Sequence, residues 1–393
     1  MTRSNALVRS LEHFVMRGVL AWLRPGPGHT RPNAPEGAHR ALICKWCCMG
    51  DAVVSLYALR EFKRRHPGVT LDVLVSSRIA EVYRRAPEIS AVYVLPVTGR
   101  RLLLELIDPR LWFRCLGQIL RLRRNGYAEF VDLELYRGTG PVLKRLIGIP
   151  FSRGFQVEGA LPKHHDFEVP LPRHMPEWQC FYRVLGMDIP SSNPPPLYPR
   201  SAENDNPAVA GSPRAASAPL GRKARIGIVF GSSFNWPQKK WPWEKYAELI
   251  TLLARDGHEF VLLGAPGERV EADRIAAKAE GPLTDTTGRL DYAGLMREVA
   301  TCDLVVGNDT GTLHLAAACG VPTVTLFGPT DPRKWNPLTS TPVFLEDIRC
   351  RPCYYLGSMP PCGHFSCLRQ MEAGVVAETV RGVLAGRPSM AQY

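Results

Sequence analysis

Two parts of the chain alternate between short apolar runs and stretches in which apolar residues recur at helical spacing. In the first part, the apolar runs lie at residues 41–45, 71–76, 92–95 and 130–133. The stretches of helical spacing between them cover residues 53–65, 79–86 and 111–124. Apolar strands separated by helices are typical of a parallel sheet that is covered by helices on both faces. The pattern therefore predicts a Rossmann-like α/β domain over residues 40–190.

The same alternation restarts after a segment of different composition. Residues 191–223 are rich in Pro, Ser, Ala and Gly, which predicts a linker. Beyond it, strands are predicted at residues 225–230, 259–263, 303–306 and 323–327. Helices are predicted at residues 242–255, 269–279 and 292–300. A second Rossmann-like domain is therefore predicted over residues 224–393.

The first 39 residues do not follow this alternation. Apolar residues at near-helical spacing stand beside arginines there, namely Leu7, Leu11, Phe14, Val15, Leu20 and Leu23, with Arg9, Arg17 and Arg24. A basic amphipathic helix of this kind can lie in a membrane interface or dock on the protein's own core, and both interpretations stay open. A Pro- and Gly-rich tether follows at residues 25–35. No small-residue cleavage site follows the apolar stretch, so we do not expect a signal peptide.

Composition restricts the partners. Lysine and arginine number 49 against 37 aspartates and glutamates, and the resulting charge of +12 favours nucleic acid, an anionic membrane surface or an acidic glycan. No zinc-finger spacing or RNA-recognition signature is present, so we expect no nucleic acid. No apolar run approaches the ~20 residues of a membrane span. Eleven cysteines without a secretory signal indicate a reducing cytoplasm and mostly free thiols.

The most informative segment is residues 307–322, which read GNDTGTLHLAAACGVP. The apolar run 303–306 predicts a buried strand before it, and the small residues within it predict a short helix. A helix N-terminus offers unpaired N–H groups and a partial positive charge, which together suit phosphate. Asp309, Thr310 and His314 add a carboxylate, a hydroxyl and an imidazole. A ligand site at the carboxyl end of a strand is the stronger interpretation, and an ordinary capped helix is the alternative.

Three motifs stand in order along the chain. They are MGDAVV at residues 49–54, KKWPWEKYAEL at 239–249, and the segment 307–322, which FGPTDP and WNP follow at 327–337. Together they resemble glycosyltransferase family 9, the heptosyltransferases that build the lipopolysaccharide inner core. The resemblance runs from about residue 40 to about residue 380. It implies GT-B architecture: two Rossmann-like domains with parallel sheets facing a central cleft, the acceptor in the first domain and the nucleotide sugar in the second.

The resemblance also implies an activity. Family members transfer a sugar with inversion and without a metal ion or cofactor. The expected donor is a nucleotide sugar, most simply ADP-heptose. The expected acceptor is an anionic glycolipid, a lipopolysaccharide core or a related lipid-linked glycan. Such an enzyme is cytoplasmic, with peripheral contact to the cytoplasmic face of the inner membrane.

Two residues match the family's catalytic positions. Asp51 matches the base that takes the proton from the acceptor hydroxyl, although Asp near a helix start also serves as a cap. Lys239 matches the lysine that reaches the phosphates, and Lys240 is the adjacent alternative.

Further residues are expected to bind the two substrates. Those implied for the nucleotide sugar are Ser232, Lys239, Glu268, Asp309, Thr310, Gly311 and His314. Those implied for the acceptor are basic, because arginine, lysine and histidine recognise phosphate and carboxylate, and they are Arg137, Lys144 and His174.

A cysteine-rich segment lies near the C-terminus and contains Cys350, Cys353, Cys362 and Cys367, with His364 among them. This spacing allows a zinc site, and structural thiols or an occasional metal are favoured over a catalytic role for the cluster. No metal is expected among the site residues. Two alternative functions are a nucleotide-sugar epimerase of GT-B architecture and a catalytically silent nucleotide-sugar-binding relative. The Asp51 motif and the set of Asp309, Thr310 and Gly311 argue against the epimerase. The presence of Asp51 and Lys239 argues against the silent relative.

Overall fold

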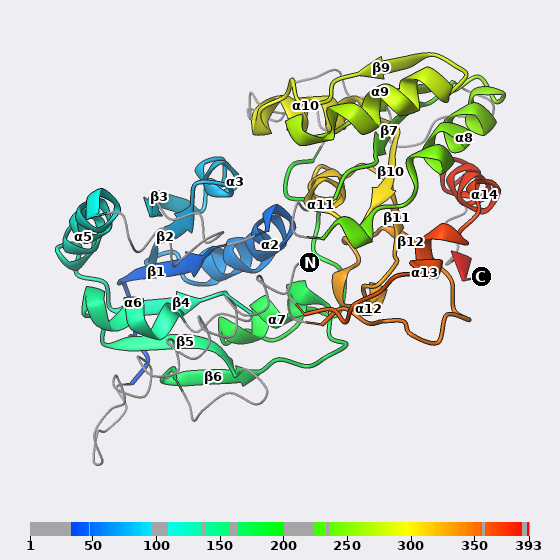
Figure 1. Ribbon diagram of the computed structural model, residues 1–393. Helices are drawn as coiled ribbons and strands as arrows, with labels where there is room; N and C mark the ends of the chain where they lie inside the picture. Colours follow the sequence, from blue (N-terminus) through cyan, green and yellow to red (C-terminus); the bar gives the residue numbers. More distant parts are fainter. Residues whose placement is uncertain are drawn as a thin grey trace. The chain divides into compact units, whose positions relative to one another are not determined.

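The computed structural model describes residues 33–46, 48–95, 109–135, 139–156, 164–199, 223–232, 236–355, 358–386 and 391–392 (Figure 1). The chain divides into two compact units, Met1–Ile189 and Pro190–Tyr393, called here the first and the second unit. Each unit has its own parallel sheet with helices packed on it, so the predicted α/β class is confirmed. The amphipathic stretch predicted within residues 1–32 lies outside the described residues.

The first unit contains a six-stranded sheet in the order β3-β2-β1-β4-β5-β6, with every pairing parallel. Its strands are β1 (Arg40–Lys45), β2 (Thr70–Ser76), β3 (Ile89–Leu95), β4 (Glu129–Asp132), β5 (Phe151–Gln156) and β6 (Phe167–Pro170). Its helices are α2 (Met49–Arg65), α3 (Ala80–Arg84), α5 (Pro109–Arg123), α6 (Thr139–Ile147) and α7 (Glu177–Val184). α2 packs against α3 and α7, whereas α5 packs against α6 and β3.

The second unit contains a seven-stranded sheet in the order β13-β12-β11-β10-β7-β8-β9, also parallel throughout. Its strands are β7 (Arg225–Val229), β8 (Glu259–Leu262), β9 (Leu283–Asp285), β10 (Leu304–Asn308), β11 (Thr323–Leu326), β12 (Thr341–Phe344) and β13 (Ala391–Gln392). Its helices are η1 (Pro237–Lys239), α8 (Trp243–Ala254), η2 (Pro266–Glu268), α9 (Arg269–Lys278), α10 (Tyr292–Thr301), α11 (Gly311–Ala318), α12 (Pro332–Trp335), α13 (Ser366–Arg369) and α14 (Ala373–Leu384).

The central strands of both sheets are buried over almost their whole length. β1 is buried from its second residue to its last, and β10 is buried throughout. Strands covered on both faces must be apolar on both, which is why they read as continuous apolar runs rather than as alternating ones. Each fully buried aliphatic side chain contributes roughly 1.5–3 kcal/mol, so these strands anchor the two cores.

Parallel pairing brings the loops that carry polar residues to one edge of each sheet. β1 and β4 are neighbours, so the segments after Lys45 and after Asp132 open at the same edge of the first unit. β7 and β10 are neighbours in the second unit, so the segments after Val229 and after Asn308 do the same. The carboxyl edge of a parallel sheet is where α/β proteins bind ligands.

The predicted strands are all present, with ends that differ by at most a few residues. The helix predicted over residues 53–65 begins earlier, at Met49, so the MGD motif lies in its first turn. Several described strands and α-helices were not predicted, and they are β5, β6, β9, β12, β13, α6, α7, α12, α13 and α14. In β6 the burial pattern is mixed and the strand ends in Pro170, so its sequence does not show an apolar run.

The segment predicted as a linker begins with residues that pack. Leu197 and Tyr198 are buried, and the Tyr198 N–H donates a hydrogen bond of 2.8 Å to the Ala318 carbonyl in the second unit. Residues 200–222 lie outside the described part of the chain. None of the helices that the structure describes combines the length and the apolar character that a membrane span requires.

Candidate active site

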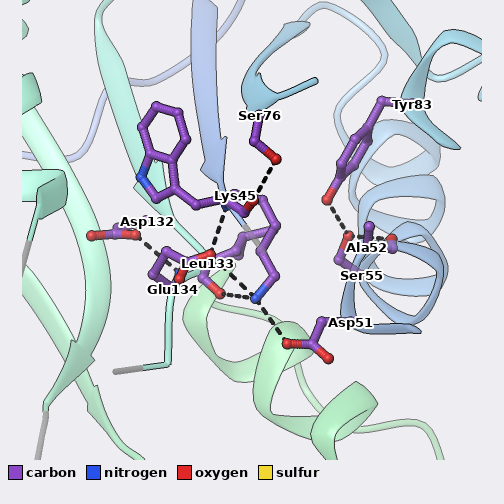
Figure 2. A network of polar contacts seen from close by, with 10 residues as sticks. Lys45, Asp51, Ala52, Ser55, Ser76, Tyr83, Asp132, Leu133 and Glu134 are labelled. Atoms are coloured by element: carbon purple, nitrogen blue, oxygen red, sulfur yellow. Dashed lines mark hydrogen bonds and ion pairs between the residues drawn. The ribbon is translucent and has the colours of Figure 1, made fainter. Parts of the chain in front are cut away.

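A fully buried lysine organises the carboxyl edge of the first unit (Figure 2). Lys45, the last residue of β1, has no exposed surface. Its ammonium Nζ lies 3.1 Å from the Leu133 carbonyl, 3.3 Å from Asp51 Oδ2 and 3.5 Å from Glu134 Oε1. A buried ammonium must be paired to be tolerated, and here two carboxylates and a carbonyl surround it.

Asp51 lies in the first turn of α2 and is 7% exposed. The residue at the N-cap position is Cys48, at φ 68°, and the cap makes no side-chain hydrogen bond. Asp51 is therefore not the N-cap of this helix, and its carboxylate is available to Lys45. Both the helix N-terminus and the Lys45 ammonium favour the ionised form of a carboxylate at this place.

Two more carboxylates, at the end of β4 and two residues beyond it, were not among the predicted site residues. Glu134 accepts a 2.7 Å hydrogen bond from the Trp46 N–H through the same oxygen that faces Lys45. Asp132 accepts from the Glu134 N–H and lies 3.5 Å from His165 Nε2. Burial raises the pKa of Asp132, while His165 opposes that shift. The sequence signal for this group was present, because charged residues end two neighbouring apolar runs.

Lys144, one of the residues predicted to bind the acceptor, does not lie at the edge that carries Lys45 and Asp51. Lys144 lies in the last turn of α6 and pairs with Asp166, which also accepts from the N–H of Ser152 at the start of β5. The end of a helix that leads into a parallel strand lies at the amino edge of the sheet, opposite the edge that carries Asp51. This position favours a structural role for Lys144.

The other two predicted acceptor residues give less information. His174 is exposed in the turn between β6 and α7. Arg137 lies outside the described residues.

In the second unit, a lysine and a carboxylate meet where β10 leads into α11. Lys239 Nζ donates a 2.8 Å hydrogen bond to Asp309 Oδ2 and lies 5.0 Å from the centre of the Tyr354 ring. The neighbouring Lys240 turns to a different partner and donates to Glu271 Oε2 at 2.5 Å. Only Lys239 of this pair therefore contacts the segment that begins α11.

The start of α11 presents buried polar atoms. Thr310 is the N-cap residue, and Gly311 begins the helix. Thr310 Oγ1 and His314 Nδ1 are buried and have no hydrogen-bond partner among the described residues. Burial lowers the pKa of His314 to about 4, with Lys239 lowering it further and Asp309 opposing. The imidazole is thus neutral at pH 7, and the unsatisfied groups favour a polar ligand here.

Glu268 and Ser232 are joined through the backbone. Glu268 Oε1 accepts from the Ser232 N–H at 3.0 Å, and Oε2 accepts from the Ala265 N–H at 2.8 Å. A Cβ on Gly231 would lie 1.9 Å from Glu268 Oε1, so a larger residue there would displace the carboxylate from these two N–H groups. Burial raises the pKa of Glu268, and the hydrogen bonds from Ala265 and Ser232 oppose that shift. Glu268 therefore holds the loop after β7 in place, in addition to any contact with a ligand.

Asn308 connects three segments of the second unit and was not predicted to have a role. Its side chain has no exposed surface. Oδ1 accepts from the Trp241 N–H at 2.9 Å, and Nδ2 donates to the carbonyls of Phe230 and Gly231 at 2.8 and 2.9 Å. Asn308 thus fixes the ends of β7 and β10 and the segment that carries Lys239. A polar residue at the end of an apolar run was the available signal.

The cysteine-rich segment contains free thiols. Cys350, Cys353, Cys362 and Cys367 are all unpaired, and in the described ranges no three His, Cys, Asp or Glu side chains are placed to hold a metal ion. Burial raises the pKa of Cys367 to about 11, with Arg351 opposing and the other three thiols adding to it. This cysteine is therefore protonated at neutral pH.

The chain is similar in sequence to known glycosyltransferases. A model of glycosyltransferase family 9 (heptosyltransferase) matches residues 139–359, more than half of the chain. Lipopolysaccharide heptosyltransferase 1 of Pseudomonas aeruginosa is 29% identical over 333 residues, covering 80% of this chain and 86% of its own. Lipopolysaccharide heptosyltransferase 2 of Escherichia coli K12 is 26% identical over 308 residues, covering 74% of this chain and 83% of its own.

Solved structures show the same fold. The E. coli ADP-heptose LPS heptosyltransferase II aligns with a TM-score of 0.67 at 19% identity, covering 89% of this chain and all of that one. The E. coli heptosyltransferase WaaC with ADP aligns with a TM-score of 0.62 at 21% identity, covering 87% and 98%. The predicted GT-B architecture is confirmed by these alignments.

Proposed function

The chain belongs to glycosyltransferase family 9, and from this membership we propose that it transfers heptose from ADP-heptose to a lipopolysaccharide core or a related lipid-linked glycan. Glycosyl transfer from a nucleotide sugar is the activity of the family. The choice of donor and acceptor is supported by the names of its relatives, which are lipopolysaccharide heptosyltransferases. The observation that carries the proposal is the buried Asp51 carboxylate beside Lys45 at the carboxyl edge of a sheet.

Asp51 acts as the general base in this proposal. Its carboxylate removes the proton from an acceptor hydroxyl as that oxygen attacks the anomeric carbon of the donor sugar. The new C–O bond forms while the bond to the diphosphate oxygen breaks, and the bonding electron pair leaves with the nucleoside diphosphate. Attack from the face opposite the leaving group inverts the anomeric configuration. Lys45 keeps Asp51 ionised before the reaction, because an opposite charge at 3.3 Å favours the carboxylate.

The second unit stabilises the leaving group. Negative charge develops on the diphosphate, and Lys239, together with the N-terminus of α11, is suited to neutralise it. Thr310 Oγ1 and the neutral His314 ring add hydrogen-bonding groups at the same place. Since a lysine and a helix N-terminus supply the positive charge, the proposed reaction needs no divalent ion.

The acceptor also sets the proposed location. A lipid-linked glycan places its enzyme at the cytoplasmic face of the inner membrane, where a net charge of +12 favours an anionic surface. The partners in this proposal are therefore the nucleotide-sugar donor and an anionic glycolipid acceptor.

Replacement of the base tests the mechanism. Asp51→Asn should lower turnover about 10²-fold or more, because general-base catalysis contributes roughly 10²–10⁴. Nucleotide binding, measured by calorimetry, should be unchanged, and Asp188→Asn, at an exposed carboxylate of the same unit, should retain full turnover. The assay contains EDTA and follows the release of nucleoside diphosphate in the presence of acceptor.

Two results would contradict parts of the proposal. Near-normal turnover of folded Asp51→Asn would exclude Asp51 as the base. Turnover that requires added magnesium would exclude the metal-free route. If the unaltered protein binds nucleotide but shows no transfer to any core glycan, it is the silent relative that the sequence left as an alternative.

A further inference from the structure

One side of α5 carries large apolar side chains into the solvent. Phe113 is 75% exposed, Leu116 51% and Leu120 45%. Separations of three and four residues place them on one stripe of the helix. Single exposed apolar residues are ordinary in soluble proteins, but three on one helix face form a patch of the kind that marks an interaction site. We call these three residues the α5 patch.

The α5 patch is not needed to attach the helix to its own unit. Leu122 of α5 is fully buried, and Cys115 and Ile119 pack against the same core cluster. These residues, also spaced by four and three, form a separate inward face that contacts β3 and its neighbours. Figure 1 shows α5 at the edge of the first unit, beside β3 and α6. The outward apolar residues therefore need another explanation.

Arginines border the α5 patch, and no acidic residue does so within the helix. Residues 109–123 contain no Asp or Glu, and their four arginines, with the one that follows, are Arg110, Arg114, Arg121, Arg123 and Arg124. All five are exposed. Arg110, Arg114 and Arg121 are separated by four and seven residues and so lie on one flank of the stripe. An apolar stripe bordered by basic residues is typical of helices that lie in a membrane interface.

Charge selects among the possible occupants of the patch. A second copy of this chain would bring the same arginines against one another. The segment 1–32 holds five arginines and a single acidic residue, Glu12, so it carries the same sign of charge. Both contacts are electrostatically unfavourable, whereas an anionic lipid surface complements the apolar and the basic residues together.

We propose that α5 docks the protein on an anionic lipid bilayer, with the α5 patch in the interface and the flanking arginines at the headgroups. The adjacent α6 has a similar pair, Leu146, which is 48% exposed, and the exposed Arg145. The proposal stands on these side chains alone and does not depend on which sugar or acceptor the enzyme uses.

Sedimentation of the full chain with lipid vesicles tests the proposal. The protein should bind vesicles of phosphatidylcholine with phosphatidylglycerol, bind pure phosphatidylcholine weakly, and lose binding as salt rises. The triple variant Phe113→Ser, Leu116→Ser, Leu120→Ser should bind at least about tenfold more weakly, and so should Arg110→Gln with Arg114→Gln.

Two matched controls probe exposed residues of the second unit. Val270→Ser removes an apolar side chain that is 64% exposed, and Arg255→Gln removes an exposed arginine. Both should bind vesicles like the unaltered protein. Circular dichroism and nucleotide binding show whether each variant is folded.

The proposal is overturned if the unaltered protein ignores anionic vesicles, or if a folded triple variant binds them as well as the unaltered protein does. Gel filtration that shows a dimer, reduced to a monomer by the triple variant, would assign the patch to a second copy instead. Because the assay contains neither donor nor acceptor, its failure leaves glycosyl transfer untouched, and failure of the Asp51 test leaves vesicle binding untouched.

Discussion

Lys45 in the first unit and Lys239 in the second each contact an aspartate of the candidate site, but their surroundings give them different capabilities. Lys45 has no exposed surface and lies among two carboxylates and a carbonyl. The Lys239 side chain is 14% exposed and lies between Asp309 and the Tyr354 ring. A fully buried ammonium is confined to its partners, whereas a partly exposed one can exchange a carboxylate for a phosphate. Lys45 therefore suits a fixed electrostatic role, and Lys239 suits ligand binding.

The neighbouring lysines of the second unit give a matched test of this difference. Lys239→Ala should weaken the binding of nucleoside diphosphate, because it removes the ammonium beside the start of α11. Lys240→Ala removes an ammonium that pairs with Glu271 and should leave binding nearly unchanged. Calorimetry of both variants measures the effect, and equal affinities would place the donor phosphates elsewhere.

His314 predicts how stability changes with pH. Its pKa is lowered to about 4 in the folded protein, mainly by burial, against 6.5 for an unperturbed histidine. Below pH 6.5 the unfolded chain takes up a proton that the folded one does not, so this group destabilises the fold as pH falls from 6.5 toward 4. From pH 7 to pH 5 the loss is of the order of 2 kcal/mol.

The variant His314→Gln should lack this part of the pH dependence. Its free energy of unfolding, measured with urea at pH 7 and pH 5, should fall by about 2 kcal/mol less than that of the unaltered protein. Parallel losses in the two proteins would show that His314 takes up its proton equally well in the folded state.

At the level of elements, the site of the second unit depends on the hydrogen bonds by which Asn308 connects the ends of β7 and β10 to the segment that carries Lys239. Asn308→Leu keeps the approximate volume but leaves the Trp241 N–H and the carbonyls of Phe230 and Gly231 without their partner. The unfolding free energy should fall by about 3 kcal/mol or more, since each buried group left unpaired costs about 1–3 kcal/mol. Nucleotide binding should weaken as well, because Lys239 precedes Trp241.

A control for this variant is Asn336→Leu in the same unit, which removes a single side-chain hydrogen bond to the Ser340 carbonyl. A loss of about 1 kcal/mol is expected there. If Asn308→Leu is no more destabilised than Asn336→Leu, the three-segment contact is not what holds the loops.

The elements that could be predicted from the sequence are those whose buried residues form an uninterrupted apolar run or a clear helical repeat. β1, β10 and α8 are apolar on the faces that pack, so their positions were predicted to within a few residues. β6 is mostly exposed or half-buried and ends in Pro170, and β12 contains Pro342, so neither shows the uninterrupted apolar run of the predicted strands. The motifs at residues 49–54 and 307–322 predicted the positions of Asp51 and of the start of α11.

The partners of these residues could not be predicted, because they come from other elements. Lys45 and Glu134 are 89 positions apart and meet only because β1 and β4 pair. Asn308 reaches Phe230 through the pairing of β10 with β7. A single sequence shows that such residues are polar at the end of an apolar run, but it does not show which groups they contact.

At the scale of the whole molecule, two basic amphipathic segments bear on the proposed location. One is α5, and the other is the predicted helix within residues 1–32, for which a membrane anchor and a core element are the two interpretations. Stable attachment to a membrane usually takes two signals, because each alone is weak and reversible. The two segments together are consistent with a peripheral enzyme.

Deletion of residues 1–32 separates the two interpretations of that helix. The sheet of the first unit begins at Arg40, and His39, which bonds to Glu129, is retained. The truncated protein should therefore fold and act on a soluble acceptor, while its binding to anionic vesicles weakens. An insoluble or inactive product would show instead that the helix belongs to the core.

The parallel pairing of both sheets has a consequence for how the chain is made. A hairpin can form as soon as its turn leaves the ribosome, but no two strands that pair in the described sheets are joined by a tight turn. β1 pairs with β2 only after α2 has been synthesised, and its other edge stays open until β4, which begins at Glu129, has emerged. Contacts this distant in sequence form slowly, because loop-closure entropy precedes the gain from pairing. While residues 46–132 are being made, the strand that ends at Lys45 therefore has an unpaired edge that must be kept from aggregating.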